Sequence, residues 1–551
     1  MSSLIWSKQL KVSLNIWSVL SLIFILILIL PNINILLNVF NESNANWVHI
    51  KTYLLKEYIT NTIILVFFTG ILSAVIGTGL AWLVSVYDFP LRSFLKWGLI
   101  LPFAIPPYIA AYTYKGMLGY TGVLQVFLRE NLGIKIDQKW VDIMSLEGAI
   151  LIFVFFLYPY VYAISRSFLE KQSASLIENA RLLGRSPFVI FWRVVLPLSR
   201  AAIIGGVSLV ILEVLNDYGV VNYFGVTTFS TAIFRTWFAL GDLDSAIKLA
   251  GLLMIIVFSV LLLEKLTRGR KKYSFTTTKV RPISRIKLTG WEAALAFTFA
   301  FGVFSLGFLI PTLQLIHWAF LTYATILNAS FFTLVLNSVL VALVASILIM
   351  LIAVIIANYA RISDGIWGKI YARMAVIGYS IPGAIIGIGV IVFFVGIDRA
   401  LYPVYQFFNP NTIKLVLSTS IIMLIFAYTI RFIAIGFNSV EAGFEKVGRK
   451  FFEASRTLGF SPTKTFLKVD LWMIKPAMFS GFILAFVDIM KELPLALILR
   501  PFNFDTLATK AYQYANDEMI HEASIASLLI ILISFASIWF FQLVIEKEVD
   551  S

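Results

Sequence analysis

Long apolar runs, separated by short polar or charged stretches, recur about twelve times along this 551-residue chain. Each run has about 18 residues or more, which is enough for a helix to cross the hydrocarbon core of a bilayer. In lipid the backbone polar groups must pair within the segment, so the runs are predicted to be helical. The pattern therefore predicts an all-α polytopic membrane protein. Its spans are expected near residues 12–31, 60–86, 95–114, 147–168, 199–219, 245–266, 291–318, 331–358, 372–396, 413–437, 477–499 and 522–544.

Composition supports this prediction and removes several classes of function. Hydrophobic residues make up 60% of the chain and charged residues 13%, and the mean hydropathy is +0.89. The net charge of +14 fits cytoplasmic loops rich in Lys and Arg, so no nucleic-acid partner is expected. The absence of Cys excludes disulfides and thiolate ligands. Because the chain has only three His residues, a histidine-rich metal site is not expected.

A basic, non-hydrophobic linker at residues 271–290 divides the chain into a first six-span repeat, residues 1–270, and a second, residues 291–551. Lys and Arg concentrate in alternate connecting segments. The positive-inside rule then predicts that both termini and the linker lie in the cytoplasm. The basic segments are 1–11, 87–96, 166–200, 265–290, 361–373, 438–475 and 545–551.

The second half repeats the first at a near-constant offset. The stretch Glu178–Pro187 aligns with Glu453–Pro462, 275 residues further on. Because each copy has six spans, both copies enter the membrane from the same side. The halves should therefore be related by an axis along the membrane normal. Further aligned pairs are Glu213 with Asp488, Asp217 with Glu492, Phe229 with Phe504, Thr231 with Thr506, and Ile105-Pro106 with Ile381-Pro382.

The duplication includes two cytoplasmic loops, 166–200 and 438–475, and each predicts a short helix, a Gly and a second helix. Gly184 and Gly459 end the first helix of each pair. A Ser-Pro pair follows each Gly, and these residue types suit an N-cap and a first helical turn. Although any loop can form a surface helix pair, one pattern kept at two equivalent places indicates a rigid element that a partner grips.

These loops resemble the EAA loops of ABC importer permeases, whose consensus is roughly Glu-Ala-Ala, three residues, Gly, nine residues, Ile-x-Leu-Pro. The first copy ends with Leu196-Pro197, as in the consensus, whereas the second has Leu471-Trp472. That departure leaves the exit geometry of the second loop open. The resemblance implies that the short helix docks on an ATPase subunit and couples ATP hydrolysis to transport. The implied coupling residues are Glu178, Ala180, Gly184, Glu453, Ala454 and Gly459.

Four acidic residues lie inside predicted spans, where charge is costly and often functional. Glu213 and Asp217 are four residues apart near the outer end of the fifth span and share a helix face, as do Asp488 and Glu492 in the eleventh. Carboxylates are hard oxygen ligands, so the four are candidate metal-binding residues of a substrate pathway. Two alternatives stay open: Lys491 neutralises a carboxylate in a structural pair, or Asp217 and Glu492 cap helix ends.

The run Leu499–Ala508 and most of the remaining chain resemble the fused two-half permeases of ferric iron ABC importers. This resemblance implies a type I ABC importer permease fold in the bacterial plasma (inner) membrane. It also implies two partners: a dimer of cytoplasmic ABC ATPases and an external or periplasmic solute-binding protein that delivers ferric ion. Near relatives transport thiamine, phosphonate or polyamine, and these substrates are the alternatives within the family.

The chain has no Gly-x-x-x-x-Gly-Lys-Ser/Thr phosphate loop, so ATP is expected on a separate ATPase and no cofactor on this chain. No catalytic residue is expected either, since no His, Cys and acid cluster converges on a loop. Two further hypotheses are a secondary transporter driven by an ion gradient and a membrane-embedded enzyme. The duplicated loops argue against the secondary transporter, because an ion-driven carrier needs no binding site for an ATPase.

Overall fold

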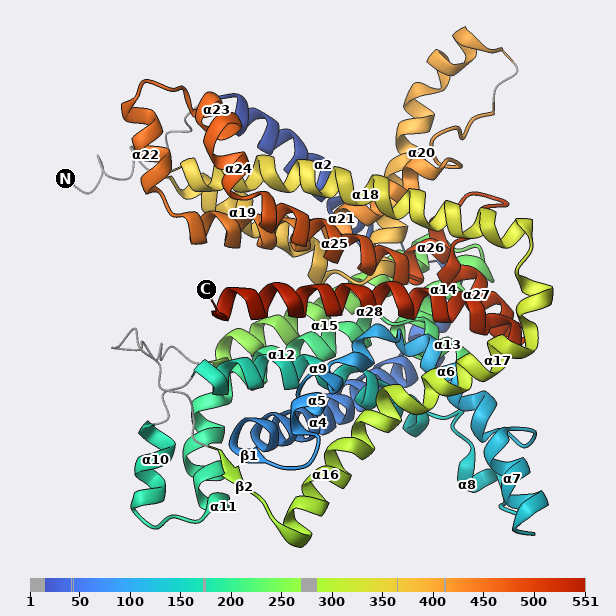
Figure 1. The fold of residues 1–551 in the computed structure, drawn as a ribbon. Coiled ribbons are helices and arrows are strands. Elements are labelled where there is room, and N and C mark those ends of the chain that lie inside the picture. Colours follow the sequence, from blue (N-terminus) through green and yellow to red (C-terminus); the bar gives the residue numbers. More distant parts are fainter. Residues whose placement is uncertain are drawn as a thin grey trace.

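The computed structural model describes residues 15–40, 42, 44–171, 175–268, 285–363, 365–410 and 413–550. Residues 271–284 of the predicted linker lie outside this part of the chain. The described chain is almost entirely helical, and its elements run mainly along one direction (Figure 1). A short parallel pair, β1 (Tyr87–Asp88) and β2 (Ile286–Lys287), joins the end of α4 to the start of the second half.

The helices of the first half are α2 (Ile16–Asn38), α3 (Ala45–His49), α4 (Leu55–Val86), α5 (Arg92–Gly98), α6 (Pro107–Leu118), α7 (Val123–Asn131), α8 (Gln138–Val141), α9 (Leu146–Lys171), α10 (Ser175–Leu182), α11 (Pro187–Ile190), α12 (Leu196–Asn216), α13 (Gly219–Tyr223), α14 (Phe229–Phe238) and α15 (Leu243–Arg268). Those of the second half are α16 (Gly290–Phe304), α17 (Ile310–Ile326), α18 (Ala329–Ile362), α19 (Ile366–Ser380), α20 (Gly383–Phe408), α21 (Ile421–Val447), α22 (Lys450–Thr457), α23 (Pro462–Thr465), α24 (Leu471–Met473), α25 (Lys475–Lys491), α26 (Pro494–Leu499), α27 (Leu507–Asn516) and α28 (Ile520–Asp550).

Each predicted span corresponds to a helix or a helix pair in the described residues. Nine helices are long and apolar enough to cross a membrane, and two bent pairs raise the number to eleven. The remaining predicted span, 12–31, corresponds to α2, whose apolar part Ile16–Pro31 is shorter. The two-repeat, all-α architecture expected from the sequence is confirmed.

Three spans predicted as single helices are broken in the structure. The span at 95–114 bends by 94° between Ala104 and Pro107, and the span at 372–396 is interrupted between α19 and α20. The interruptions fall on Ile105-Pro106 and Ile381-Pro382, where proline removes a backbone donor and favours an extended residue before it. The span at 477–499 ends at Lys491, and the short α26 follows. Hydropathy cannot detect the breaks at Ile105-Pro106 and Ile381-Pro382, because the runs on both sides of them are apolar.

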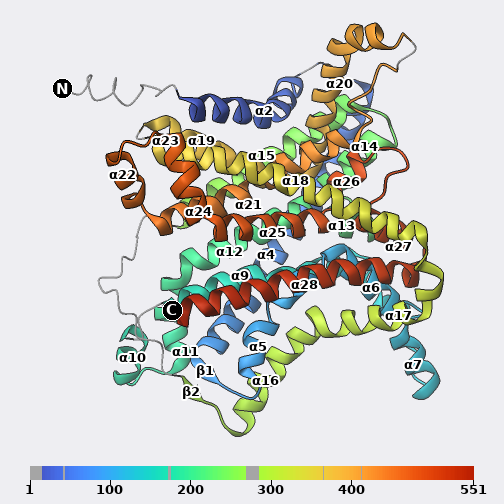
Figure 2. The same cartoon turned by 45° about the horizontal axis from the view of Figure 1, so that its top comes forward.

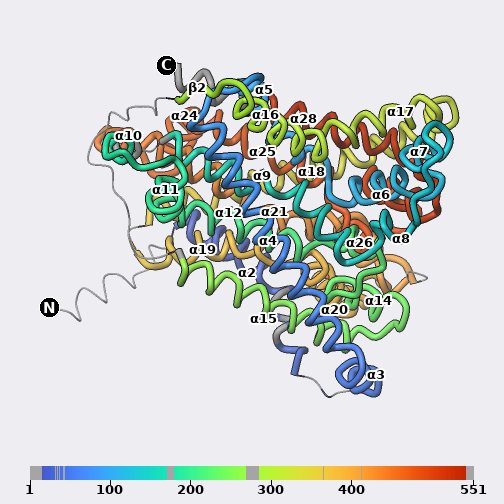
Figure 3. Tube along the Cα trace, turned by 90° about the horizontal axis from the view of Figure 1, so that it is seen from below, coloured from blue at the N-terminus to red at the C-terminus, as the bar shows by residue number. Residues whose placement is uncertain are grey.

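The two halves exchange helices. In the first half α2 packs against α18, α19 and α20 of the second (Figures 2 and 3), and α15 also contacts α20. In return, α16 contacts α5, while α17 and α28 contact α6. The repeats therefore form one interlocked body in which the first helix of each copy packs on the other copy.

Small residues set the helix crossings within each half. A Cβ on Gly77 of α4 would lie 2.7 Å from Cβ of Val161 on α9, and one on Gly206 of α12 would lie 2.7 Å from Cα of the same valine. In the second half the small residue is on the opposite helix, because Gly436 of α21 faces Ala353 of α18. This close approach is typical of membrane helices, which associate by packing rather than by the hydrophobic effect.

The aligned offset changes after the eleventh span. Thr228 and Thr231 form a capping box at the start of α14, and Thr506 and Thr509 form the same box at the start of α27. The structurally equivalent residues are thus 278 apart, so the predicted pairing of Thr231 with Thr506 is three residues out of register. The loop before α27 is longer by that amount, and it contains the ion pair of Arg500 with Asp505.

Candidate functional site

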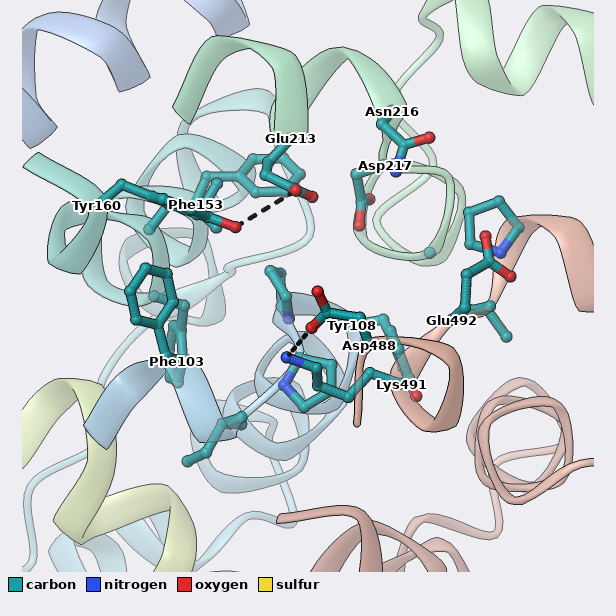
Figure 4. A pocket seen from close by; sticks show the side chains of 18 of the residues that line it. Phe103, Tyr108, Phe153, Tyr160, Glu213, Asn216, Asp217, Asp488, Lys491 and Glu492 are labelled. Atoms are coloured by element: carbon teal, nitrogen blue, oxygen red, sulfur yellow. Dashed lines mark hydrogen bonds and ion pairs between the residues drawn. The ribbon is translucent and has the colours of Figure 1, made fainter. Parts of the chain in front are cut away.

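A cavity of about 140 Å³ lies between the halves, close to the breaks in the spans (Figure 4). All four predicted acidic residues line it. Most of the other lining residues occur as equivalent positions of the two repeats, so the cavity lies where the pseudo-symmetric halves meet. These pairs are Phe103 with Tyr379, Phe156 with Arg431, Leu157 with Phe432, Asn216 with Lys491, and Gly219 with Pro494.

Two of the four acids cap the short helices that follow the broken spans. An oxygen of Asp217 accepts a hydrogen bond from the backbone N–H of Val220 at 2.8 Å. Glu492 accepts from the N–H groups of Leu495 at 3.0 Å and of Ala496 at 3.3 Å. Carboxylates are favourable there because the first backbone donors of a helix lack partners and carry partial positive charge. The capping alternative is therefore correct for Asp217 and Glu492, although the capped helices are α13 and α26.

The other two acids, Glu213 and Asp488, have different partners. Tyr160 and Tyr379 each donate a hydrogen bond to the same oxygen of Glu213 at 3.3 Å. Asp488 instead forms an ion pair with Lys491, with 3.0 Å between Oδ1 and Nζ. The structural pairing proposed for Lys491 thus involves Asp488. Across the described residues, no three His, Cys, Asp or Glu side chains form a group that could hold a metal ion.

Arg431 of α21 is a site residue that the sequence reasoning missed. Its Nη1 donates to Oδ1 of Asn216 at 2.8 Å, and its Nε lies 4.0 Å from Oε1 of Glu492. Oδ1 of Asn216 also accepts from the N–H of Gly383 at 2.6 Å, so this side chain joins the first half to the second. The sequence did contain a signal for Arg431. It is a basic residue within a predicted span, and the first repeat has Phe156 at the equivalent position.

The two duplicated loops have nearly the same local structure. After α10, Arg185 N–H donates to the Ala180 carbonyl at 3.2 Å and Gly184 N–H to that of Arg181 at 2.9 Å. After α22, Phe460 and Gly459 repeat these bonds at 3.2 and 3.1 Å. This is the Schellman motif, which requires a left-handed residue, and φ is +71° at Gly184 and +82° at Gly459. We call the two segments, 175–195 and 450–470, the coupling turns.

Both coupling turns expose apolar side chains at equivalent positions. Leu183 is 79% exposed and Leu458 is 77% exposed, and Trp192 and Leu467 are also exposed. Ser186 and Ser461 cap the second helix of each turn, as predicted. Figure 1 shows both turns at the same end of the molecule as the C-terminal end of α28, with α7 and α8 at the opposite end. Of the predicted coupling residues, Glu453 and Ala454 are exposed, while the Glu178 side chain is outside what the structure describes.

The exits of the two turns differ, as Pro197 and Trp472 suggested. Residues Pro187–Asn216 form one continuous helical stretch, whereas the second turn bends by 71° between Met473 and Lys475. Both exits contain a π-helical turn, Phe191–Val195 and Phe466–Asp470. Such turns weaken regular helical hydrogen bonding and occur often at functional positions.

The second turn is tied to the helix bundle by an ion pair and a hydrogen bond that are not seen at the equivalent positions of the first turn within the described residues. Nη1 of Arg361 donates to the fully buried Asp470 at 3.0 Å, and its guanidinium lies 4.1 Å from the ring centroid of Phe444. Trp17 of α2 donates to Thr463 at 3.2 Å. At the position of Asp470 the first turn has Val195, an apolar residue that cannot form this ion pair.

Comparison with known proteins gives the family. The model of binding-protein-dependent transport system inner membrane components matches residues 73–263 and 349–551, one segment in each half. The chain belongs to this family. Together with the apolar helices, membership identifies a multi-pass transport subunit of the inner membrane. The two matched segments also contain both coupling turns and all four acids of the cavity.

Two ferric permeases are similar to most of this chain, and a sulfate permease is similar to a shorter part of it. The Fe(3+)-transport system permease protein FbpB 2 of Haemophilus influenzae is 24% identical over 489 residues, 87% of this chain and 88% of that protein. The ferric transport system permease protein FbpB of Actinobacillus pleuropneumoniae is 22% identical over 474 residues, 82% of this chain and 66% of that protein. The sulfate transport system permease protein CysW of Escherichia coli K12 is 33% identical over 148 residues, 27% of this chain and 48% of that protein.

Proposed function

We propose that this chain is the membrane channel of an ATP-driven importer of ferric iron. Similarity to ferric permeases over more than four-fifths of the chain carries the choice of substrate. The oxygen-lined cavity between the halves supports it, because ferric ion is a hard cation that prefers carboxylate and phenolate ligands.

The coupling turns are the segments that would contact the ATPase subunits. Each presents a rigid helix with an exposed leucine, Leu183 or Leu458, which fits an apolar groove on an ATPase subunit. Two turns predict two ATPase subunits, and this chain then has no hydrolytic role or cofactor of its own. Closure of the ATPase dimer would move the turns toward each other and pass this motion along α12 and α25 to the cavity.

The orientation follows from the same assignment. The coupling turns and the C-terminal end of α28 lie at one end (Figure 1), and so do β1 and the start of α19, which belong to two of the basic segments. We therefore place both termini in the cytoplasm, and α7, α8 and α27 on the outer side, where a solute-binding protein would deliver the substrate.

Sulfate is the second candidate substrate. Arg431 and Lys491 line the cavity, and guanidinium and ammonium groups bind oxyanions. Against it, Lys491 is paired with Asp488 and Arg431 lies beside Glu492, so both charges already have acidic neighbours.

Uptake by cells tests the proposal. Cells lacking the chain should accumulate less ⁵⁵Fe(III) than cells in which it is restored, and ³⁵S-sulfate uptake should be equal in the two. If the chain restored only sulfate uptake, sulfate would be the substrate rather than ferric iron. Iron uptake that is independent of the chain would overturn the proposal.

A further inference from the structure

We propose that Tyr160, Glu213 and Tyr379 form the site that holds ferric iron during its passage, an inference that rests on the proposed function. The acids alone provide no such site, because Asp217 and Glu492 already cap helices. Glu213 is the acid of the four that neither caps a helix nor pairs with a cation within 4 Å in the described residues. Its available partners are two phenols.

The geometry suits a small, hard cation. Both phenol oxygens lie 3.3 Å from the same carboxylate oxygen. For an octahedral ion with metal–oxygen bonds of about 2.0 Å, neighbouring ligand oxygens lie about 2.8 Å apart. Each phenol oxygen therefore needs to approach the Glu213 oxygen by about 0.5 Å to ligate the same ion. All three are partly exposed, so an ion in the cavity can reach them.

Charge balance also favours ferric ion. Each phenol would lose its proton to solvent as its iron–oxygen bond forms, because the ligand must be the phenolate. Two phenolates and one carboxylate then offset the three charges of the ion, with no change in the oxidation state of iron. A divalent cation bound by the same two phenolates and one carboxylate would leave one net negative charge in this low-dielectric place, which is costly.

A second observation indicates that the cavity receives an oxygen-bearing ligand. Arg431 is 6% exposed, and its Nε has no hydrogen-bond acceptor within the described part of the chain, although the side chain lines the cavity. A buried donor without a partner is costly, and this one can be satisfied by an oxygen atom of a ligand in the cavity. Ferric ion in water carries hydroxide or other oxygen ligands, and Arg431 is placed to donate to one of them.

The site draws on both halves but is not duplicated. Tyr160 and Glu213 come from α9 and α12, and Tyr379 comes from α19 in the other half. The equivalent positions around Asp488 hold Phe103 and Ile435, which offer no oxygen ligand. One site per chain is thus expected. Relative motion of the halves would withdraw Tyr379 and weaken the site, which permits release.

Spectroscopy of the full-length chain in lipid nanodiscs tests the site directly. Titration with Fe(III)-nitrilotriacetate should produce the visible charge-transfer band of iron–phenolate bonds. The band should weaken in Tyr160→Phe and Tyr379→Phe and vanish in the double variant, and Glu213→Gln should weaken iron binding by about tenfold or more. The controls Tyr158→Phe, a buried phenol on α9 outside the cavity lining, and Tyr120→Phe, an exposed phenol, should leave the band unchanged.

Unaltered thermal unfolding of the Phe variants would confirm that they fold, since only a hydroxyl is removed. A wild-type chain with no charge-transfer band, or a double variant with an undiminished band, would overturn the site. If chain-dependent ⁵⁵Fe uptake by cells persisted in that case, the proposed function would stand without it. If the wild-type chain instead supported no ⁵⁵Fe uptake by cells, the proposed function itself would be refuted.

Discussion

Substitution of Gly459 by Val tests whether the coupling turn must hold its shape. The residue has φ of +82°, and a Cβ added there would meet nothing within 4 Å. The expected penalty is therefore conformational, about 1–2 kcal/mol for a left-handed residue with a side chain. This free energy makes the turn about 5- to 30-fold less favourable relative to other loop conformations. We expect Gly459→Val, and likewise Gly184→Val, to insert normally but to transmit ATPase motion poorly.

Reconstitution with the partner ATPase and the solute-binding protein gives the readout, which is iron accumulated per ATP hydrolysed. The ratio should fall several-fold in Gly459→Val and stay near wild type in Gly459→Asn, because Asn tolerates the left-handed conformation. Gly241→Val is a matched control: it has φ of +63° and open space, but it lies between α14 and α15, away from both turns. If Gly459→Val and Gly184→Val kept the wild-type ratio, the turns would not be the route of coupling.

Two further predictions concern packing and the buried ion pair. Gly77→Leu should destabilise the chain by about 1–3 kcal/mol, because its Cβ would meet Val161 at 2.7 Å, and this should lower the unfolding temperature in detergent. The control Gly79→Leu should have little effect, because a Cβ there would meet nothing within 4 Å. Equal effects of the two substitutions would refute the packing argument. Asp470→Asn should cost about 3–5 kcal/mol and reduce uptake, because the Arg361 side chain, which is 9% exposed, would remain beside a neutral group. An Arg361→Met, Asp470→Leu double variant should recover part of that stability, and no recovery would show that the charge is not the cause.

Much of the architecture could be predicted because its causes are local. Apolar length defines each span, and the repeated Gly and Ser-Pro pattern defines the coupling turns through left-handed φ and helix capping. The breaks after Ala104 and Ser380 were missed, although the proline signals at Pro106 and Pro382 were visible. Proline inside an apolar run does not reveal whether a helix bends, ends or continues, because neighbouring helices decide how the freed backbone groups are satisfied.

The acidic residues of the cavity could be predicted from the sequence, but their contacts could not. The four acids were predicted as a set, and the structure brings all four to one cavity. Their different partners could not be predicted, because capping by Asp217 depends on the break after α12, and the phenols of Tyr160 and Tyr379 reach Glu213 only in the folded arrangement. The position of Arg431 opposite Asn216 is likewise a tertiary contact between halves.

The most direct test of the central claim is iron entry into proteoliposomes that contain the chain and its ATPase, with iron-loaded binding protein on the opposite side. The account predicts ⁵⁵Fe accumulation that requires ATP on the ATPase side and is lost in a Glu178→Ala, Glu453→Ala double variant that still inserts. Iron entry at the same rate without ATP, or in the double variant, would contradict the claim that ATP drives import through the two coupling turns.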